Sequence, residues 1–152
     1  MLHVLGALAW LATSLAGSGA ELSGHEPDSA RVEKSKLSVE AFTAEMSAAA
    51  QYSAGKEGTV TVTVTANGDF KINQQFPFRL RLADPPEGVS YPKAVLKRDD
   101  ATFAEKVATF KVGFVPQKAG KYLLGGTVSL SVCDEKKCVM EKVPLDVEVT
   151  VQ

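Results

Sequence analysis

The sequence predicts an all-β domain, an antiparallel β-sandwich, on the basis of three observations. Apolar and polar residues alternate with a period of two along most of the chain from Leu37 onward. Turn-forming residues, mainly Gly, Pro, Asn and Asp, separate these alternating stretches at short intervals. The chain has 152 residues, which is enough for one domain with a hydrophobic core. We therefore expect residues 36–152 to form one sandwich domain.

Two segments precede this predicted domain. Residues 4–16 are apolar except for Thr13 and Ser14, and small residues follow at Ser18-Gly19-Ala20. This pattern is typical of a secretory signal peptide over residues 1–20, although its first three residues lack Lys and Arg, and a buried N-terminal helix is the alternative. Residues 21–35 are polar and charged and predict a flexible lead-in. We therefore expect export through this signal to the periplasm. Because the apolar run is too short to span a bilayer, we expect no membrane span in the mature chain.

The first half of the predicted domain contains three alternating stretches separated by turns. Their apolar residues are, in order, Leu37, Val39 and Ala41; Val60, Val62 and Val64; and Phe76, Phe78, Leu80 and Leu82. The alanines of 38–51 also permit a helix, but we interpret this segment as a strand that runs into a loop. Pro77 predicts an edge strand or a strand start. Turns are predicted at 67–69 and 84–88.

The second half predicts three longer strands. Ala108, Phe110, Val112 and Phe114 form one inward face, and 122–133 and 138–151 are the last two strands. Gly125-Gly126 indicates a bulge, and Tyr122, after the loop ending at Gly120, suggests a tyrosine corner. About seven short strands in about 115 residues are typical of an immunoglobulin-like sandwich.

Composition and residue types exclude several functions. The net charge is −1, from 17 basic and 18 acidic residues, so nothing indicates a nucleic acid or an anionic membrane as partner. Beyond the predicted signal peptide His25 is the one histidine, which leaves a Ser-His or Cys-His mechanism without a base. No Gly-rich phosphate loop follows a strand, so we expect no cofactor. We also expect a monomer.

The only two cysteines, Cys133 and Cys138, flank a polar turn of four residues. Pairing them across that turn places Ser131 opposite Met140 and both cysteines on the less apolar face of the ribbon. Directly opposed residues of an antiparallel pair can form a disulfide, and in an exported protein we expect this one to form.

The spacing alone leaves three interpretations of this pair. The first is a structural staple, although closing so small a loop stabilises a fold by only about 2 kcal/mol. The second is a redox pair, because labile disulfides tend to be exposed. The third is a Cu(I) site formed by Cys133, Cys138 and Met140, which are soft ligands. A zinc site would need four ligands, which the segment does not supply.

Two stretches of the chain resemble a known family. The first stretch is 119–138, which includes Gly126-Thr127-Val128-Ser129-Leu130-Ser131-Val132-Cys133 and Cys138, and it is followed by Val143-Pro144-Leu145. The second stretch is Gly68-Asp69-Phe70-Lys71-Ile72-Asn73, which is followed by Phe76-Pro77. The sequence resembles the N-terminal periplasmic domain of the thiol:disulfide interchange protein DsbD and its small secreted relatives. The resemblance covers about the last 90 residues, with a specific core of about 30 residues. In this sequence we expect neither the transmembrane nor the thioredoxin-like domain of that family, and Val139-Met140-Glu141 stands where many relatives have a proline-containing segment.

The resemblance implies an immunoglobulin-like fold in which Cys133 and Cys138 are the exchanging pair. It implies a component of thiol–disulfide oxidoreductase chemistry, whose partner is a periplasmic thioredoxin-like protein or a membrane electron donor. The family also shields its cysteines with an aromatic cap loop. Tyr91 and Phe103 are the candidates for such a cap, and both also fit ordinary core or loop positions. The alternative to an exchange module is a non-catalytic secreted interaction domain with a structural disulfide.

Overall fold

The structure, a computed structural model, describes residues 34–152. The predicted signal peptide 1–20 and most of the predicted lead-in lie outside the described residues. The strands are β1 (Lys36–Ser38), β2 (Phe42–Ser47), β3 (Gly58–Ala66), β4 (Lys71–Ile72), β5 (Arg79–Leu82), β6 (Val89–Ser90), β7 (Val95–Lys97), β8 (Ala101–Phe103), β9 (Val107–Pro116), β10 (Gly120–Cys133) and β11 (Cys138–Val151). A single 3₁₀ turn, Arg98–Asp100, separates β7 from β8. No helix within 34–152 has the length and apolar character needed to cross a bilayer.

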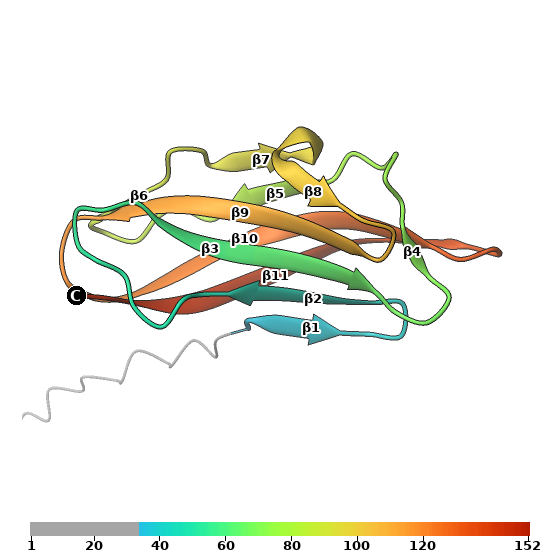
Figure 1. The fold of residues 1–152 in the computed structure, drawn as a ribbon, viewed down its shortest axis with the longest axis horizontal. Coiled ribbons are helices and arrows are strands. Elements are labelled where there is room, and N and C mark those ends of the chain that lie inside the picture. The colour runs from blue at the N-terminus through green and yellow to red at the C-terminus, as the bar shows by residue number, and fades with distance from the viewer. Residues whose placement is uncertain (1–33) are drawn as a thin grey trace, which may run out of the picture. The chain divides into compact units, whose positions relative to one another are not determined.

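The strands form two antiparallel sheets that pack face to face (Figure 1). One sheet has the order β1-β2-β3-β9-β6, and β8 also pairs with β9. The other has the order β11-β10-β5-β7, and β4 also pairs with β10. The neighbours β2-β3-β9-β8 and β11-β10-β5-β7 follow the A-B-E-D and G-F-C-C′ orders of an immunoglobulin sandwich. This strand order confirms the predicted immunoglobulin-like fold.

The core consists of the inward faces of both sheets. The strands alternate as predicted, because residues at every second position point to the same face. The largest side chains that are fully enclosed are Phe42, Phe78, Phe110, Phe114, Met46, Leu80, Leu124 and Leu130, accompanied by Val60, Val62, Val64 and Val112. This core is large enough to hold the sandwich without a covalent link.

The predicted tyrosine corner is present at the start of β10. The Tyr122 hydroxyl donates a hydrogen bond to the Lys118 carbonyl at 2.7 Å. In immunoglobulin-like domains this bond ties the start of the corresponding strand to the loop before it. It fixes the entry of β10, the strand that ends at Cys133.

The predicted bulge at Gly125-Gly126 is wrong. The register between β10 and β11 is continuous, with Gly126 opposite Leu145 and Pro144 opposite Thr127. Gly126 is instead needed because β5 passes closely, since a Cβ there would lie 2.9 Å from the Arg81 carbonyl oxygen. The continuous register carries the pairing without a shift to the cysteines.

The prediction of about seven strands was too low, because the described residues contain 11. The missed strands have two or three residues each, too few to show a period. The predicted first strand, with Leu37, Val39 and Ala41 on one face, is also wrong. Residues 39–41 turn between β1 and β2, and the Val39 amide bonds to the Phe42 carbonyl.

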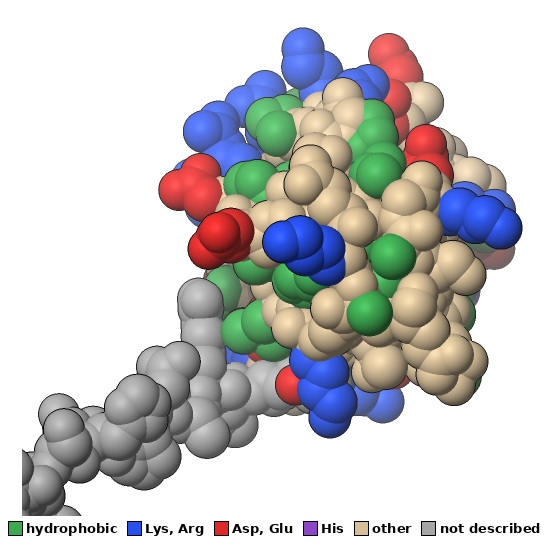
Figure 2. Space-filling model, turned by 90° about the vertical axis from the view of Figure 1, so that its left-hand side faces the viewer, with side chains coloured by type: hydrophobic (Ala, Val, Ile, Leu, Met, Phe, Trp, Pro, Cys, Tyr) green, Lys and Arg blue, Asp and Glu red, His purple; other side chains and the backbone are tan. Residues whose placement is uncertain are grey.

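The end of the sandwich away from the β10–β11 turn has a mixed surface. Figure 2 shows apolar side chains there in small separate groups among polar, basic and acidic ones. Small scattered groups of this kind are normal on a monomeric surface. At the other end of the sandwich, the hairpin of β10 and β11 extends outward (Figure 1).

Candidate functional site

The candidate site is the tip of the β10–β11 hairpin. Fourteen residue pairs join the two strands, from Gly120 opposite Val151 to Cys133 opposite Cys138. Cys133 and Cys138 form a disulfide, with an S–S distance of 2.05 Å and a Cα–Cα distance of 4.0 Å. The predicted pairing is confirmed, including Ser131 opposite Met140.

The turn between the cysteines is held by hydrogen bonds of its own. The Asp134 amide donates to the Lys137 carbonyl at 2.9 Å. One carboxylate oxygen of Asp134 accepts the amides of Lys136 and Lys137, each at 2.8 Å. Asp134 and Lys137 therefore form a hydrogen-bonded pair. The next pair along the ribbon toward the sandwich, Cys133 and Cys138, is of the non-hydrogen-bonded kind, in which the two Cα atoms lie closer together.

The same two amide hydrogen bonds hold the pKa of Asp134 below its ordinary value of 3.8, since they favour the charged carboxylate. A carboxylate whose pKa is lowered in the folded state stabilises the fold at pH values above its ordinary pKa. This stabilisation disappears as the pH falls through the lowered pKa. At neutral pH the turn therefore keeps both bonds.

The two sulfurs differ in their surroundings. Cys138 is exposed, because it begins β11 at the border of the sheet. Cys133 is half-buried, because β10 has β11 along one edge and β4 along the other. Lys71 of β4 is the direct partner of Cys133 on that second edge. An approaching thiol therefore reaches Cys138 more easily than Cys133.

The face that carries the cysteines is less open than the sequence suggests. Ser131 is 0% exposed although it lies on the polar face of β10. Asn73 covers it, because its amide nitrogen donates to the Ser131 carbonyl at 3.0 Å and its side-chain amide donates to the hydroxyl at 3.3 Å. Lys71 and Asn73 were not predicted as neighbours of the disulfide, although both lie in a stretch that carries the family resemblance.

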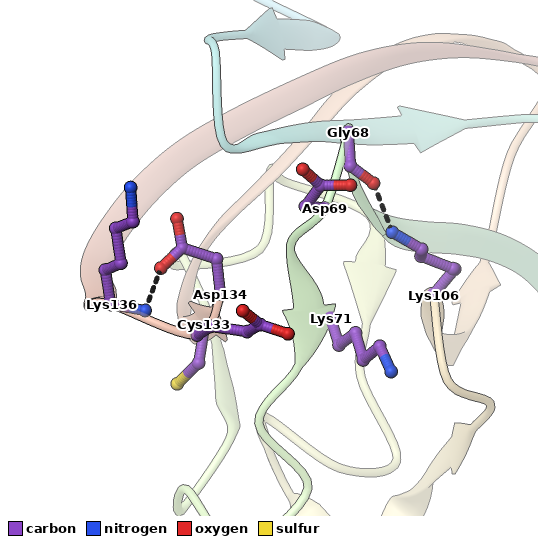
Figure 3. Close-up of a pocket in the computed structure, with 8 residues that line it drawn as sticks. Gly68, Asp69, Lys71, Lys106, Cys133, Asp134 and Lys136 are labelled. Atoms are coloured by element: carbon purple, nitrogen blue, oxygen red, sulfur yellow. Dashed lines mark hydrogen bonds between the residues drawn. The ribbon is translucent and has the colours of Figure 1, made fainter.

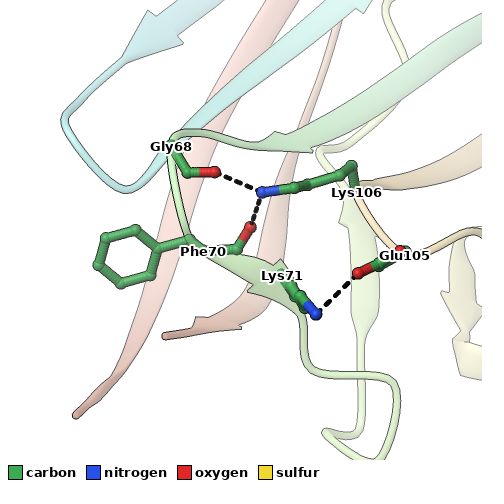
Figure 4. A network of polar contacts seen from close by, with 5 residues as sticks. All are labelled: Gly68, Phe70, Lys71, Glu105 and Lys106. Carbon is green, nitrogen blue, oxygen red and sulfur yellow. Dashed lines mark hydrogen bonds and ion pairs between the residues drawn. The ribbon is translucent and has the colours of Figure 1, made fainter. Parts of the chain in front are cut away.

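A polar network fixes β4 in place beside Cys133 (Figure 4). The Lys106 ammonium donates to the carbonyls of Gly68 and Phe70. Lys71 forms an ion pair with Glu105 at 2.8 Å. Their hydrogen bond and mutual charge raise the pKa of Lys71 and lower that of Glu105. These contacts tie β4 to the turn before β9.

A depression with a volume of about 830 Å³ lies beside the disulfide (Figure 3). It is lined by Gly68, Asp69, Lys71, Lys106, Cys133, Asp134, Glu135 and Lys136. A second depression, on the other side of Lys71, also reaches Cys133. The lining carries both signs of charge, so the surface next to the sulfurs is polar and without a strong overall charge.

The structure places neither aromatic cap candidate over the disulfide. Tyr91 follows β6, which pairs with Val115 and Pro116 at the end of β9 remote from Lys106. Phe103 packs against Phe78, with ring centroids 5.3 Å apart. The aromatic ring at the hairpin tip is Phe70, and the Lys137 ammonium lies 5.8 Å from its centroid.

Tyr91 provides a test of the packing at the other end. Its hydroxyl is buried and has no hydrogen-bond partner among the described residues. Burial raises the pKa of Tyr91 to about 12. In the unfolded chain the phenol ionises near its ordinary value of 10.0, so its contribution to folding is complete below that pH and disappears as the pH rises toward 12.

We expect a Tyr91→Phe variant to be as stable as the wild type or more stable at pH 7, because it removes an unpaired hydroxyl. We also expect it to lose less free energy of unfolding than the wild type between pH 9 and pH 11. Urea denaturation at each pH measures both effects. A Tyr122→Phe control breaks the bond to Lys118 and is expected to destabilise the domain at pH 7. A Tyr91→Phe variant that is destabilised at pH 7 would contradict the placement of this hydroxyl.

Met140 lies two residues from Cys138 on the same face of β11 and is 65% exposed. No group of three or more His, Cys, Asp and Glu side chains within 34–152 is arranged to hold a metal. The three sulfurs of the predicted Cu(I) alternative do share one face of the ribbon, but the disulfide engages two of them. That alternative therefore applies to the reduced protein.

Comparisons with known proteins give distant structural similarity. No protein-family model matches the chain, and no curated protein matches it. The CARDB domain of the PF1109 protein from Pyrococcus furiosus, solved with di-metal ions, has a TM-score of 0.41 and 14% identity over 76% of this chain and 97% of that one. AggA, the major subunit of aggregative adherence fimbriae type I from Escherichia coli, has a TM-score of 0.36 and 10% identity over 73% of this chain and 95% of that one. The fold assignment rests on the strand order itself.

Proposed function

We propose that this protein is a periplasmic thiol–disulfide exchange module in which Cys133 and Cys138 alternate between disulfide and dithiol. The observation that carries the proposal is the position of the bond, which closes a protruding hairpin and presents Cys138 to solvent. The resemblance of the cysteine segment to the DsbD N-terminal domain supports the same chemistry. Its partners would be a thioredoxin-like protein or a membrane electron donor, and it would act as a monomer.

The surroundings of the bond favour exchange over a purely structural role. The disulfide adds only about 2 kcal/mol to the fold by loop closure. The turn, the pairing of β4 with β10 and the packed core hold the same strands without it. Opening the bond therefore leaves the domain folded, as a reversible carrier requires.

The proposed step moves two electrons and two protons. A partner thiolate attacks the sulfur of Cys138, a mixed disulfide forms, and Cys133 leaves as a thiolate that takes up a proton. The second thiol of the partner then attacks the partner sulfur that is bonded to Cys138. This step releases Cys138 as a thiol and closes the disulfide of the partner. The reverse sequence oxidises the module.

A redox titration tests this function. We expect residues 34–152, equilibrated with mixtures of reduced and oxidised dithiothreitol, to have a midpoint potential less negative than about −300 mV, where labile pairs lie. We also expect the oxidised protein to accept electrons from a reduced thioredoxin within minutes, followed by thiol alkylation and mass measurement.

A midpoint well below that value, without electron transfer from thioredoxin, would instead support the second candidate, an interaction domain with a structural disulfide. That candidate accounts equally well for the presence of the bond. A tight Cu(I) complex of the reduced protein that weakens in a Met140→Leu variant would support the copper alternative.

A further inference from the structure

We propose that Asp134 sets the redox equilibrium of the cysteine pair by keeping the hairpin turn in its bonded shape when the disulfide is open. The inference rests on the proposed exchange function and makes Asp134 a positioning residue for the two sulfurs. It assigns a role to a side chain that lies next to Cys133 in the sequence.

The hydrogen bonds of the turn do not depend on the sulfur–sulfur bond. One oxygen of Asp134 accepts two backbone amides, and its own amide donates to the Lys137 carbonyl. All three bonds lie within residues 134–137, on the far side of the cysteine pair from the core. They therefore remain available in the dithiol form.

Both ends of the turn are also anchored to the segment that contains β4. Cys133 pairs with Lys71 across the second edge of β10. The Lys137 ammonium lies over the Phe70 ring. Since Lys106 in turn holds the Gly68 and Phe70 carbonyls, the support beneath the turn is itself fixed (Figure 4).

A turn that stays formed changes the free energy of closing the disulfide. The two thiols of a flexible tip must lose conformational entropy before their sulfurs can meet. Thiols already held across from one another avoid most of that cost, so closure becomes more favourable. Each turn contact that survives reduction therefore favours the disulfide and makes the potential more negative.

Removal of the Asp134 side chain tests this inference. Each variant is equilibrated with dithiothreitol, whose two thiols become its cyclic disulfide as the protein disulfide becomes two thiols. We expect Asp134→Ala to shift the equilibrium constant about tenfold toward the dithiol, because it loses two hydrogen bonds to the turn. For this two-electron couple, a tenfold change is about 30 mV.

Two further variants separate hydrogen bonding from charge. Asp134→Asn keeps a carbonyl acceptor but loses the negative charge, and we expect a shift of less than about threefold, since one acceptor still serves both amides. Glu135→Gln removes the adjacent charge, which accepts no turn hydrogen bond, and we expect less than a twofold shift. Equal shifts for Asp134→Ala and Asp134→Asn would overturn the inference, because charge alone would then explain them.

A second measurement needs no variant. In reduced wild-type protein, we expect the amides of Lys136 and Lys137 to remain protected from hydrogen exchange relative to the amide of Glu135. Rapid exchange of all three would overturn the inference, because the turn would then open with the disulfide. Both experiments use dithiothreitol alone, so a failure to exchange with thioredoxin would defeat the proposed function without deciding the role of Asp134.

Discussion

A Cys133→Ala variant is expected to be captured by a thioredoxin-like partner, whereas a Cys138→Ala variant is expected to be captured slowly. Cys138 is exposed at the border of its sheet, and Cys133 is half-buried between β11 and β4. Exchange requires the three sulfurs to approach in line with the bond that breaks, so access controls the rate. We therefore expect Cys138 to be the sulfur that joins the partner and Cys133 to be the one that resolves the mixed disulfide.

The capture can be measured with a thioredoxin that lacks its second cysteine and carries thionitrobenzoate on the first. Attack by the remaining protein thiol releases thionitrobenzoate, which is followed by its absorbance. We expect the rate to be at least about tenfold higher with Cys138 than with Cys133, because only Cys138 is freely accessible.

A small disulfide reagent serves as the control for intrinsic reactivity. We expect the two variants to differ less with this reagent than with the protein partner, because a small molecule is less restricted by β4. Equal rates for both variants with the protein partner would contradict the assignment of Cys138 as the attacked sulfur.

A Phe78→Ala variant is expected to lose about 3–5 kcal/mol of unfolding free energy, as is usual for a large aromatic side chain removed from a core. Phe78 is 1% exposed and precedes β5. Its ring packs edge-on against Phe76, at 5.7 Å between centroids, and against Phe103, at 5.3 Å. A loss of this size is a large fraction of the stability of an ordinary domain.

Urea denaturation measures this loss, with Phe78→Leu as the matched variant. Leucine keeps most of the buried volume, so we expect it to cost about 1–2 kcal/mol. A cost below about 1 kcal/mol for Phe78→Ala would show that this ring is not a core residue. Both measurements should be made on the oxidised protein, so that the disulfide is constant.

The longer strands and the cysteine pairing could be predicted from the sequence. Val60, Val62 and Val64 alternate with threonines, and all three are fully buried as that alternation predicts. Counting back from Cys133 and Cys138 was enough to place Ser131 opposite Met140. Such predictions succeed because a strand of nine or more residues repeats its two-residue period several times.

The surroundings of the disulfide could not be predicted in the same way. β4 has two residues, so its pairing with Cys133 follows from tertiary packing and leaves no periodic signal. The burial of Ser131 depends on Asn73, which is 58 residues away along the chain. The alternation of residues along a strand shows on which face of the sheet each residue lies, but it does not show whether another segment covers that face.

The turn at 134–137 contains no buried side chain. It contacts the sandwich at the surface, where the Lys137 ammonium lies over the Phe70 ring. Its sequence can therefore be redesigned with little effect on the packed interior. With the exchange that we propose for this pair, a library of four-residue turns on this scaffold would yield proteins of one architecture with graded oxidising strength. Such a set would serve as calibrated electron acceptors for engineering disulfide formation in cells.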